Sequence, residues 1–154
     1  MSIITIRELV ETDLEFLVEI RNECRFFLHN ASEFSLENCR DWFKKTNPKF
    51  YVIQHEDTPI GYFRTSDWQK DSCWVGGDLH KDFRGKGLMK AAYFKLFEHL
   101  KSLKINVVYL SVLNFNEVAF NLYKKLGFAT TSTTDVVQGG TGRFANSIQM
   151  VKEI

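Results

Sequence analysis

The stretch HKDFRGKGLMK at residues 80–90 combines the residue types that are best suited to bind an anion. Gly85 and Gly87 flank Lys86, and an apolar run typical of a helix follows directly. The first N–H groups of a helix have no partner within the helix, and the helix dipole adds about half a positive charge there. Glycines let a phosphate approach the backbone closely, and Arg84 and Lys86 add mobile positive charge. The stretch therefore predicts a site for a phosphate or pyrophosphate.

Other phosphate-binding motifs do not match this stretch. A Walker P-loop requires GxxxxGK[ST], which is absent, and Lys90 stands where a Rossmann fingerprint has its third glycine. A protein kinase needs a much longer chain than these 154 residues. The two glycines are also compatible with an ordinary turn between a strand and a helix, so a second segment is needed to decide.

Residues 116–128, NEVAFNLYKKLGF, supply that second segment. They are similar to the N-x-x-A-x-x-L-Y-x-x-x-G-F pattern of the GNAT superfamily of N-acetyltransferases, and Arg84-x-x-Gly87 resembles motif A of that family, [QR]-x-x-G-x-[GA]. The resemblance covers essentially the whole chain and implies acetyl transfer from acetyl-CoA to an amine. Met89 departs from the pattern, because the family prefers glycine or alanine there. Its side chain should pack under the helix or loosen the contact with the pyrophosphate.

The resemblance also implies where acetyl-CoA would lie. The cofactor would occupy a gap between two splayed parallel strands, residues 73–80 and 106–113. The backbone of Asp78 and Leu79 would pair with the pantetheine arm like an added strand, and Asn116 would hydrogen-bond the cofactor beyond the sheet. The pyrophosphate would be bound where the helix opens, by the segment comprising Arg84, Gly85, Lys86, Gly87, Leu88, Met89 and Lys90.

Acetyl transfer needs a neutral amine, a stabilised oxyanion and a proton for the leaving thiolate. The resemblance makes Tyr123 the candidate general acid, because its hydroxyl, with a reference pKa of about 10, could protonate the thiolate. A backbone N–H of the strand that carries Leu79 could stabilise the oxyanion. Tyr123 follows Asn116 by seven positions, or two helical turns, so both could face the gap. A tyrosine buried in the core would show the same spacing.

The general base is less well defined. Ser111 occupies the position at which some relatives carry glutamate, and serine cannot deprotonate an ammonium group. Asp78 is the candidate base, although its side chain could face the other side of the sheet. His80, Glu117 and ordered water are alternatives.

The acceptor site is expected near the end of the first helix. Arg21, Asn22 and His29 form a polar cluster there, which fits a pocket for an acceptor with an anionic feature or, equally, a solvated helix end. The QGGTGR segment at residues 138–143 predicts a hairpin, with an acceptor-side lid as the alternative. We expect the acceptor to be a primary amine on a small molecule, such as an amino sugar or a nucleotide-linked amino sugar. The alternatives are a protein N-terminal α-amine and a CoA-binding module without catalysis.

The elements that position these residues follow the order β-α-α-β-β-β-α-β-α-β-β. They predict an α/β (α+β) fold in a single domain, residues 1–154, with a mostly antiparallel mixed sheet of about six or seven strands and about four flanking helices. The pattern at Thr12–Glu15 predicts a capping box for the first helix, and the second helix should begin after Ser35 and end near Asn47. The Gly76–Gly77 pair predicts a bulge or the close approach of another backbone.

Composition excludes several classes of function. The formal net charge of +1 gives no support for binding nucleic acid or an anionic membrane. The N-terminus lacks a basic leader and an apolar signal core, and no apolar run approaches the roughly 20 residues that span a bilayer, so we expect a cytoplasmic protein. The cysteines and histidines show no spacing typical of a disulfide framework or a metal site. A homodimer, common in the family, is left open.

Overall fold

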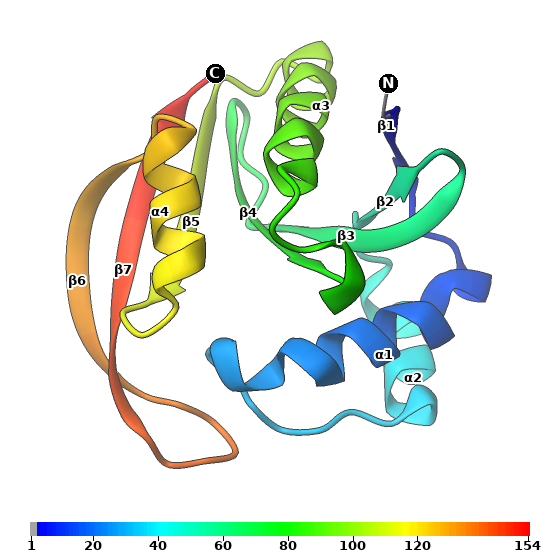
Figure 1. Ribbon diagram of the computed structural model, residues 1–154, viewed down its shortest axis with the longest axis horizontal. Helices are drawn as coiled ribbons and strands as arrows, with labels where there is room; N and C mark the ends of the chain where they lie inside the picture. Colours follow the sequence, from blue (N-terminus) through cyan, green and yellow to red (C-terminus); the bar gives the residue numbers. More distant parts are fainter. Residues whose placement is uncertain (1–2) are drawn as a thin grey trace.

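Residues 3–154 are described by the structure, a computed structural model, and they form seven strands and four α-helices (Figure 1). The strands are β1 (Ile4–Glu8), β2 (Tyr51–His55), β3 (Thr58–Ser66), β4 (Ser72–Leu79), β5 (Val107–Leu113), β6 (Ala129–Val137) and β7 (Phe144–Glu153). The helices are α1 (Leu14–Cys24), α2 (Leu36–Thr46), α3 (Leu88–Ser102) and α4 (Glu117–Lys125). The order of these elements is the predicted one.

All seven strands belong to one sheet with the order β1-β2-β3-β4-β5-β7-β6. Neighbouring strands are antiparallel except β4 and β5, whose parallel pairing ends at Trp74 and Tyr109. Beyond that point the two strands diverge, as Figure 1 shows below their upper ends. The edge of β4 that would face β5 is therefore open from Val75 to Leu79, which confirms the predicted mixed sheet with splayed central strands.

Helices cover both faces of the sheet, because successive residues of a strand point to opposite sides. Ile53 and Phe63 pack into one core with α3 and α4. Their neighbours Val52 and Tyr62 pack on the other side with α1 and α2. The open edge of β4 thus lies between two helical layers and can be approached from either.

The two consecutive glycines of β4 make room for side chains, not for another backbone or a bulge. The β3–β4 register runs without a shift, whereas the irregularity in this part of the sheet lies between β2 and β3, where Ile53 and Gln54 pair with Gly61 and Pro59. A Cβ on Gly76 would lie 2.5 Å from Nη2 of Arg64, and one on Gly77 would lie 2.6 Å from Cε of Met89. The predicted bulge is therefore wrong, and Met89 packs beneath the sheet edge as expected of a larger side chain.

The ends of the first two helices test the predicted caps. The capping box at Thr12–Glu15 is wrong, since no described side chain caps the start of α1. Instead, the carboxylate of Asp13 accepts a hydrogen bond from the N–H of Val10 at 2.9 Å and is held by Arg7. The start of α2 is confirmed, because the Ser35 hydroxyl accepts from the backbone of the first turn. Its end is confirmed too, with the chain leaving the helix at Asn47 in a left-handed conformation.

Within residues 3–154 no helix is long and apolar enough to cross a membrane. The same residues contain no group of three or more His, Cys, Asp or Glu side chains that could hold a metal ion. Cys24, Cys39 and Cys73 are all buried free thiols.

Candidate active site

The glycine-rich turn leads into α3 and presents open backbone. Gly85 and Gly87 have φ values of +74° and +75°, which side chains other than glycine rarely adopt, and no atom lies within 4 Å of where a Cβ would stand. Gly87 is the N-cap residue of α3, and its carbonyl accepts from the N–H of Ala91. The N–H groups that precede Ala91 in the first turn point out of the helix end. The predicted anion site therefore has the required geometry.

The Arg84 side chain holds this turn against α1 and β4. Its Nε donates to the carbonyl of Leu79 at 2.9 Å, and its Nη2 lies 2.9 Å from Sγ of Cys24 and 3.4 Å from a carboxylate oxygen of Glu23. Sequence reasoning assigned Arg84 to the cofactor and did not foresee these contacts. The guanidinium fixes the end of the open strand relative to the start of α3.

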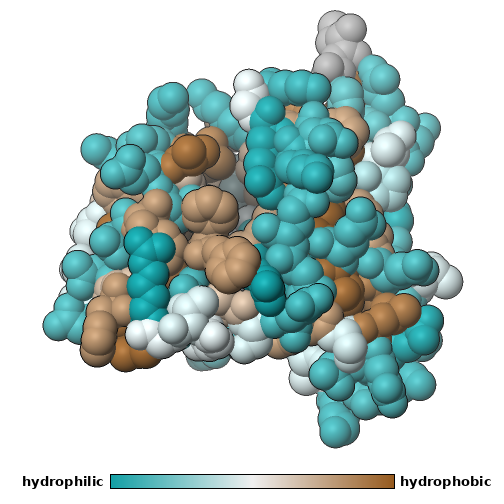
Figure 2. Space-filling view, turned by 60° about the horizontal axis from the view of Figure 1, so that its bottom comes forward, coloured by the Kyte–Doolittle hydropathy of each residue, from teal (hydrophilic) through white to brown (hydrophobic). Residues whose placement is uncertain are grey.

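A cavity of about 550 Å³ lies between the open edge of β4, the start of α3 and α4. It is lined by nine of the predicted cofactor residues, namely Asp78, Leu79, Arg84, Gly85, Gly87, Leu88, Met89, Lys90 and Asn116. Tyr123 lines it as well, whereas Lys86 is not among its lining residues. Phe27 and Val118, 48% and 84% exposed, also line the cavity. Figure 2, which brings the lower side of Figure 1 forward, shows apolar residues gathered in the middle of that face.

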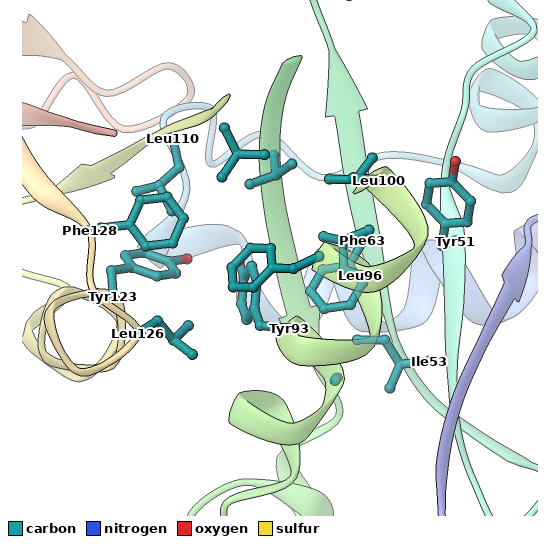
Figure 3. Close-up of a cluster of buried hydrophobic side chains, with 14 of the residues drawn as sticks. Tyr51, Ile53, Phe63, Tyr93, Leu96, Leu100, Leu110, Tyr123, Leu126 and Phe128 are labelled. Carbon is teal, nitrogen blue, oxygen red and sulfur yellow. The ribbon is translucent and has the colours of Figure 1, made fainter. Parts of the chain in front are cut away.

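Asn116, the N-cap residue of α4, and Tyr123, within α4, differ in which of their polar groups remain available to a ligand. Oδ1 of Asn116 accepts a hydrogen bond from the N–H of Ala119 at 3.4 Å and so caps α4. A contact between Asn116 and a cofactor would have to use the remaining groups of the amide. Tyr123 is 7% exposed, and its hydroxyl points away from α4 toward Tyr93 (Figure 3). Burial raises the pKa of Tyr123, so its hydroxyl stays protonated at physiological pH.

Tyr93, on α3, lies directly beside Tyr123. The two rings meet edge to face with their centroids 5.9 Å apart. The Tyr93 hydroxyl is buried, and Tyr123 is its candidate partner, because hydrogen bonding between the two hydroxyls contributes to the pKa of each. Tyr93 is not among the residues that line the cofactor cavity, so it is a useful comparison for the role of Tyr123.

The Asp78 carboxylate lies on the opposite face of the sheet, where donors hold it. Oδ2 accepts from the Tyr62 hydroxyl and from Nη1 of Arg64, both at 2.5 Å. Burial lowers the pKa of the Arg64 guanidinium, but Asp78, together with the neighbouring tyrosines, more than offsets this and raises the pKa overall. The sequence had singled out neither Tyr62 nor Arg64, although a charged residue inside the apolar IGYFRTS strand was an available signal. The geometry favours a positioning role for Asp78, and its role as base stays a prediction.

A second cavity, of about 670 Å³, lies on the face covered by α1 and α2. Gly76 of β4 and Ser111 of β5 line it, whereas the next three residues of β4, Gly77 to Leu79, line the cofactor-side cavity. The two cavities therefore approach each other at the open edge of β4. We name them the cofactor cavity and the acceptor cavity after the roles proposed below.

Two of the three predicted acceptor residues line this second cavity. Arg21 lines it, but its guanidinium donates to the carbonyls of Asn30 and Ser32, both at 2.5 Å, and lies 3.9 Å from the ring centroid of Phe34. Asn22 does not line the cavity, because its amide is hydrogen-bonded to both the N–H and the carbonyl of Phe34. These contacts order the connection between α1 and α2.

His29 is the third predicted residue, and it lines the cavity. Its Nε2 lies 2.7 Å from Oγ of Ser147, which also accepts a hydrogen bond from Gln149. Burial, assisted by the charge of Arg64, lowers the pKa of His29 below its ordinary value of 6.5. The imidazole is therefore neutral at physiological pH and can accept a proton.

The β6–β7 loop is tied to the connection between α1 and α2. Gln138 is 2% exposed, and its amide donates to the carbonyls of Phe26 and Leu28. Gly139 donates its N–H to the carbonyl of His29 and accepts from the N–H of Ala31. The sequence showed only a glycine-rich hairpin here, and nothing in it identified Gln138 as a buried anchor. The loop thus holds the segment between α1 and α2, of which Leu28, His29 and Asn30 line the acceptor cavity.

Comparison with known proteins gives a consistent result. The sequence model of the acetyltransferase (GNAT) family matches residues 14–128. A peptidyl-lysine N-acetyltransferase, YjaB, of Salmonella typhimurium is 28% identical over 110 residues, which are 71% of this chain and 70% of that protein.

Solved structures show the same fold. A spermidine N-acetyltransferase from Vibrio cholerae, in complex with CoA and spermine, superposes with a TM-score of 0.87 at 18% identity, over 97% of this chain and 95% of the other. A phosphinothricin acetyltransferase from Sinorhizobium meliloti, in complex with acetyl-CoA, gives a TM-score of 0.80 at 19% identity, over 98% and 88%.

Proposed function

Because the chain belongs to the GNAT acetyltransferase family, we propose that it transfers the acetyl group of acetyl-CoA to a primary amine on a small molecule. The protein is an N-acetyltransferase, and acetyl-CoA is its cosubstrate. One observation supports the proposal most strongly: two cavities on opposite faces of the sheet approach each other at the open edge of β4. A thioester from one side and an amine from the other can meet at that edge.

The proposed binding mode of acetyl-CoA follows from the cofactor cavity. The amides at the start of α3, from Gly85 to Lys90, would bind the pyrophosphate, and the open edge of β4 would hydrogen-bond the pantetheine arm. The backbone N–H beside Leu79 is the candidate donor to the oxyanion that forms on the thioester carbonyl. Tyr123 would give its proton to the leaving sulfur atom, since its hydroxyl is protonated and lines this cavity.

The acceptor side offers a proton acceptor other than Asp78. His29 is neutral and lines the acceptor cavity, whereas the Asp78 carboxylate is held by Tyr62 and Arg64. We assign His29 the proton that the amine loses as the C–N bond forms, and we assign Asp78 the task of positioning Arg64. Replacing His29 with Gln should lower kcat at neutral pH by about 10²-fold if this assignment holds.

The pH dependence separates this role from a structural one. A base whose pKa lies below 6.5 is active above that pKa and loses activity as the pH falls through it. The acidic limb of the kcat profile should therefore belong to His29 and disappear in the His29→Gln variant. An unchanged acidic limb in the variant would refute the assignment.

The volume of the acceptor cavity, about 670 Å³, is in the range that suits a small metabolite. The segment between α1 and α2 that lines it is held in place by hydrogen bonds with the β6–β7 loop. An amino sugar or nucleotide-linked amino sugar is one candidate acceptor. The relatives include proteins named for peptidyl-lysine and spermidine, so a protein amine, including an N-terminal α-amine, is the second candidate. Within this proposal the chain forms a single cytoplasmic domain over residues 1–154, and its oligomeric state stays untested.

Release of CoA from acetyl-CoA tests the function directly. The purified protein is incubated with acetyl-CoA and a panel of small amines, and CoA release is followed together with the acetylated product by mass spectrometry. We expect at least one small amine to accelerate release above hydrolysis with formation of its N-acetyl product. Binding of acetyl-CoA without amine-dependent release for any member, peptides included, would instead support a CoA-binding module without catalysis.

A further inference from the structure

The walls of the acceptor cavity are largely aromatic. Five large rings contribute to its lining, namely Phe34, Trp42, Phe50, Tyr62 and Trp74. Phe50 packs edge to face on Trp42 with the centroids 5.1 Å apart, and it stacks on Tyr62 at 6.2 Å with the planes 3° apart. Such walls bind flat or apolar groups through dispersion and burial. The lining also includes polar side chains that can hydrogen-bond a ligand, among them Asn30, Asn38, Thr65 and Ser66.

The charges that line the cavity are all positive. Arg21 and Arg64 contribute side chains to the lining, and no Asp or Glu does so among residues 3–154. Arg64 is paired with Asp78, whose carboxylate lies behind it. Arg21 forms no ion pair within the described residues, because its partners are the neutral carbonyl oxygens of Asn30 and Ser32. Arg21 therefore brings to the wall a positive charge that has no ion-pair partner of its own.

The basic groups of the cavity also act on one another. Burial lowers the pKa of Arg21 and the charge of Arg64 acts in the same direction, whereas Tyr62 and Asp78 act to raise it. Burial also lowers the pKa of His29, and the charge of Arg64 is the second cause of that shift. The repulsion between these groups would be relieved by an anion near them, whereas an additional cation would increase it. Aromatic walls and limited exposure to solvent strengthen both effects, since water screens charges less in such a site.

We propose that the acceptor is a primary amine that carries an anionic group and a flat or apolar body, with the anion near Arg21 and Arg64 and the body against the aromatic walls. This inference rests on the proposed function, whose acceptor it makes specific. It disfavours acceptors with a second positive charge, such as polyamines and lysine in a basic peptide.

Matched amines that differ in charge alone test the inference. We would measure kcat/KM for phenylalanine, phenylalaninamide and 2-phenylethylamine, and for leucine, leucinamide and 3-methylbutylamine, at saturating acetyl-CoA. The ratio of kcat/KM between 2-aminoethyl phosphate and ethanolamine shows whether a phosphate can take the place of the carboxylate. Spermidine is measured as the representative polycation. Each value is corrected for the fraction of the amine that is unprotonated. The anionic member of at least one series should exceed its neutral and cationic partners by about tenfold or more.

A variant assigns this preference to the proposed residues. Replacing Arg64 with Met removes the charge but keeps much of the apolar bulk, and it should reduce the preference for the anionic amine to about threefold or less. Arg25→Met is the control, because it removes an arginine that follows α1 and does not line the cavity. Stabilisation of both variants by acetyl-CoA should match the wild type, which shows that they fold.

The outcomes separate the two proposals. Turnover of spermidine or of the neutral amides equal to that of the anionic amines would overturn the inference and leave the acetyltransferase function intact. An anionic preference that survives in both Arg64→Met and Arg21→Met would overturn the assignment of the charge. The absence of amine-dependent CoA release with every compound would count against the small-molecule function itself.

Discussion

The cofactor cavity and the acceptor cavity share one strand but are built in different ways. The cofactor cavity uses a nearly continuous segment, residues 77–90, together with α4, and its proposed ligand contacts are mostly backbone groups. The acceptor cavity gathers side chains from α1, α2, β3, β4, β5 and the segment between α1 and α2. A backbone site binds the same cofactor whatever the neighbouring side chains are, whereas a side-chain site can change its ligand by substitution. The difference explains how one fold can keep its acetyl donor and vary its acceptor.

We expect the largest effect from a substitution that alters only the backbone groups of the cofactor cavity. Gly87→Val places a β-branched residue at φ +75°, where the pyrophosphate is proposed to approach. We expect the stabilisation of the protein by acetyl-CoA to disappear and turnover to fall by about 10²-fold or more. Gly142→Val is the matched control, because Gly142 has φ +71° and equally open surroundings but lies in the β6–β7 loop. Equal loss of acetyl-CoA binding in both variants would mean that strain alone is responsible.

The next effect concerns the chemistry at the meeting point. Tyr123→Phe should lower kcat by about 10²-fold with little change in the KM of acetyl-CoA, because it removes a proton donor from an otherwise intact wall. Tyr93→Phe is the control, because Tyr93 is the neighbouring tyrosine and is not among the residues that line the cofactor cavity, so its loss should lower kcat by much less. Steady-state kinetics of both variants decide the matter. Full turnover in Tyr123→Phe would exclude the role of general acid.

A smaller effect should be confined to the acceptor cavity. Gln138→Ala removes two hydrogen bonds that tie the β6–β7 loop to the connection between α1 and α2. We expect the KM of the amine to rise by about tenfold while stabilisation by acetyl-CoA stays unchanged. Ser132→Ala, on the exposed strand β6, serves as the control. A rise in the KM of acetyl-CoA instead would show that the two cavities are not independent.

The smallest effect lies outside both cavities. The hydrogen bond with Arg7 lowers the pKa of Asp13 from 3.8, although burial acts in the opposite direction. The stabilisation by the ionised Asp13 is therefore present above pH 3.8 and is lost as the pH falls through the lowered pKa of the folded state. Asp13→Asn should cost about 1 kcal/mol at pH 7, and the difference in Tm from the wild type should shrink in acid. Neither KM should change.

The difference between the two cavities also explains which of them could be predicted from the sequence. The cofactor cavity was predictable because Gly85, Gly87 and the motif on α4 are close in sequence to the elements that they terminate or cap. The acceptor cavity depends on contacts between distant segments, such as Gln138 with Leu28, and no local pattern reports them. The capping box at Thr12 failed for a related reason: Arg7, on β1, draws the neighbouring Asp13 into an ion pair. Side-chain pairing across elements overrides local propensity where both partners are partly buried.

The central claim is that acetyl-CoA enters from the α3 and α4 side and presents its thioester at the open edge of β4. A crystal structure of the protein with acetyl-CoA tests this claim most directly. We predict the pyrophosphate on the amides of residues 85–90, the pantetheine beside Asp78 and Leu79, and the sulfur within hydrogen-bond reach of the Tyr123 hydroxyl. A cofactor bound in the acceptor cavity, or a sulfur far from both Tyr123 and the edge of β4, would contradict the account.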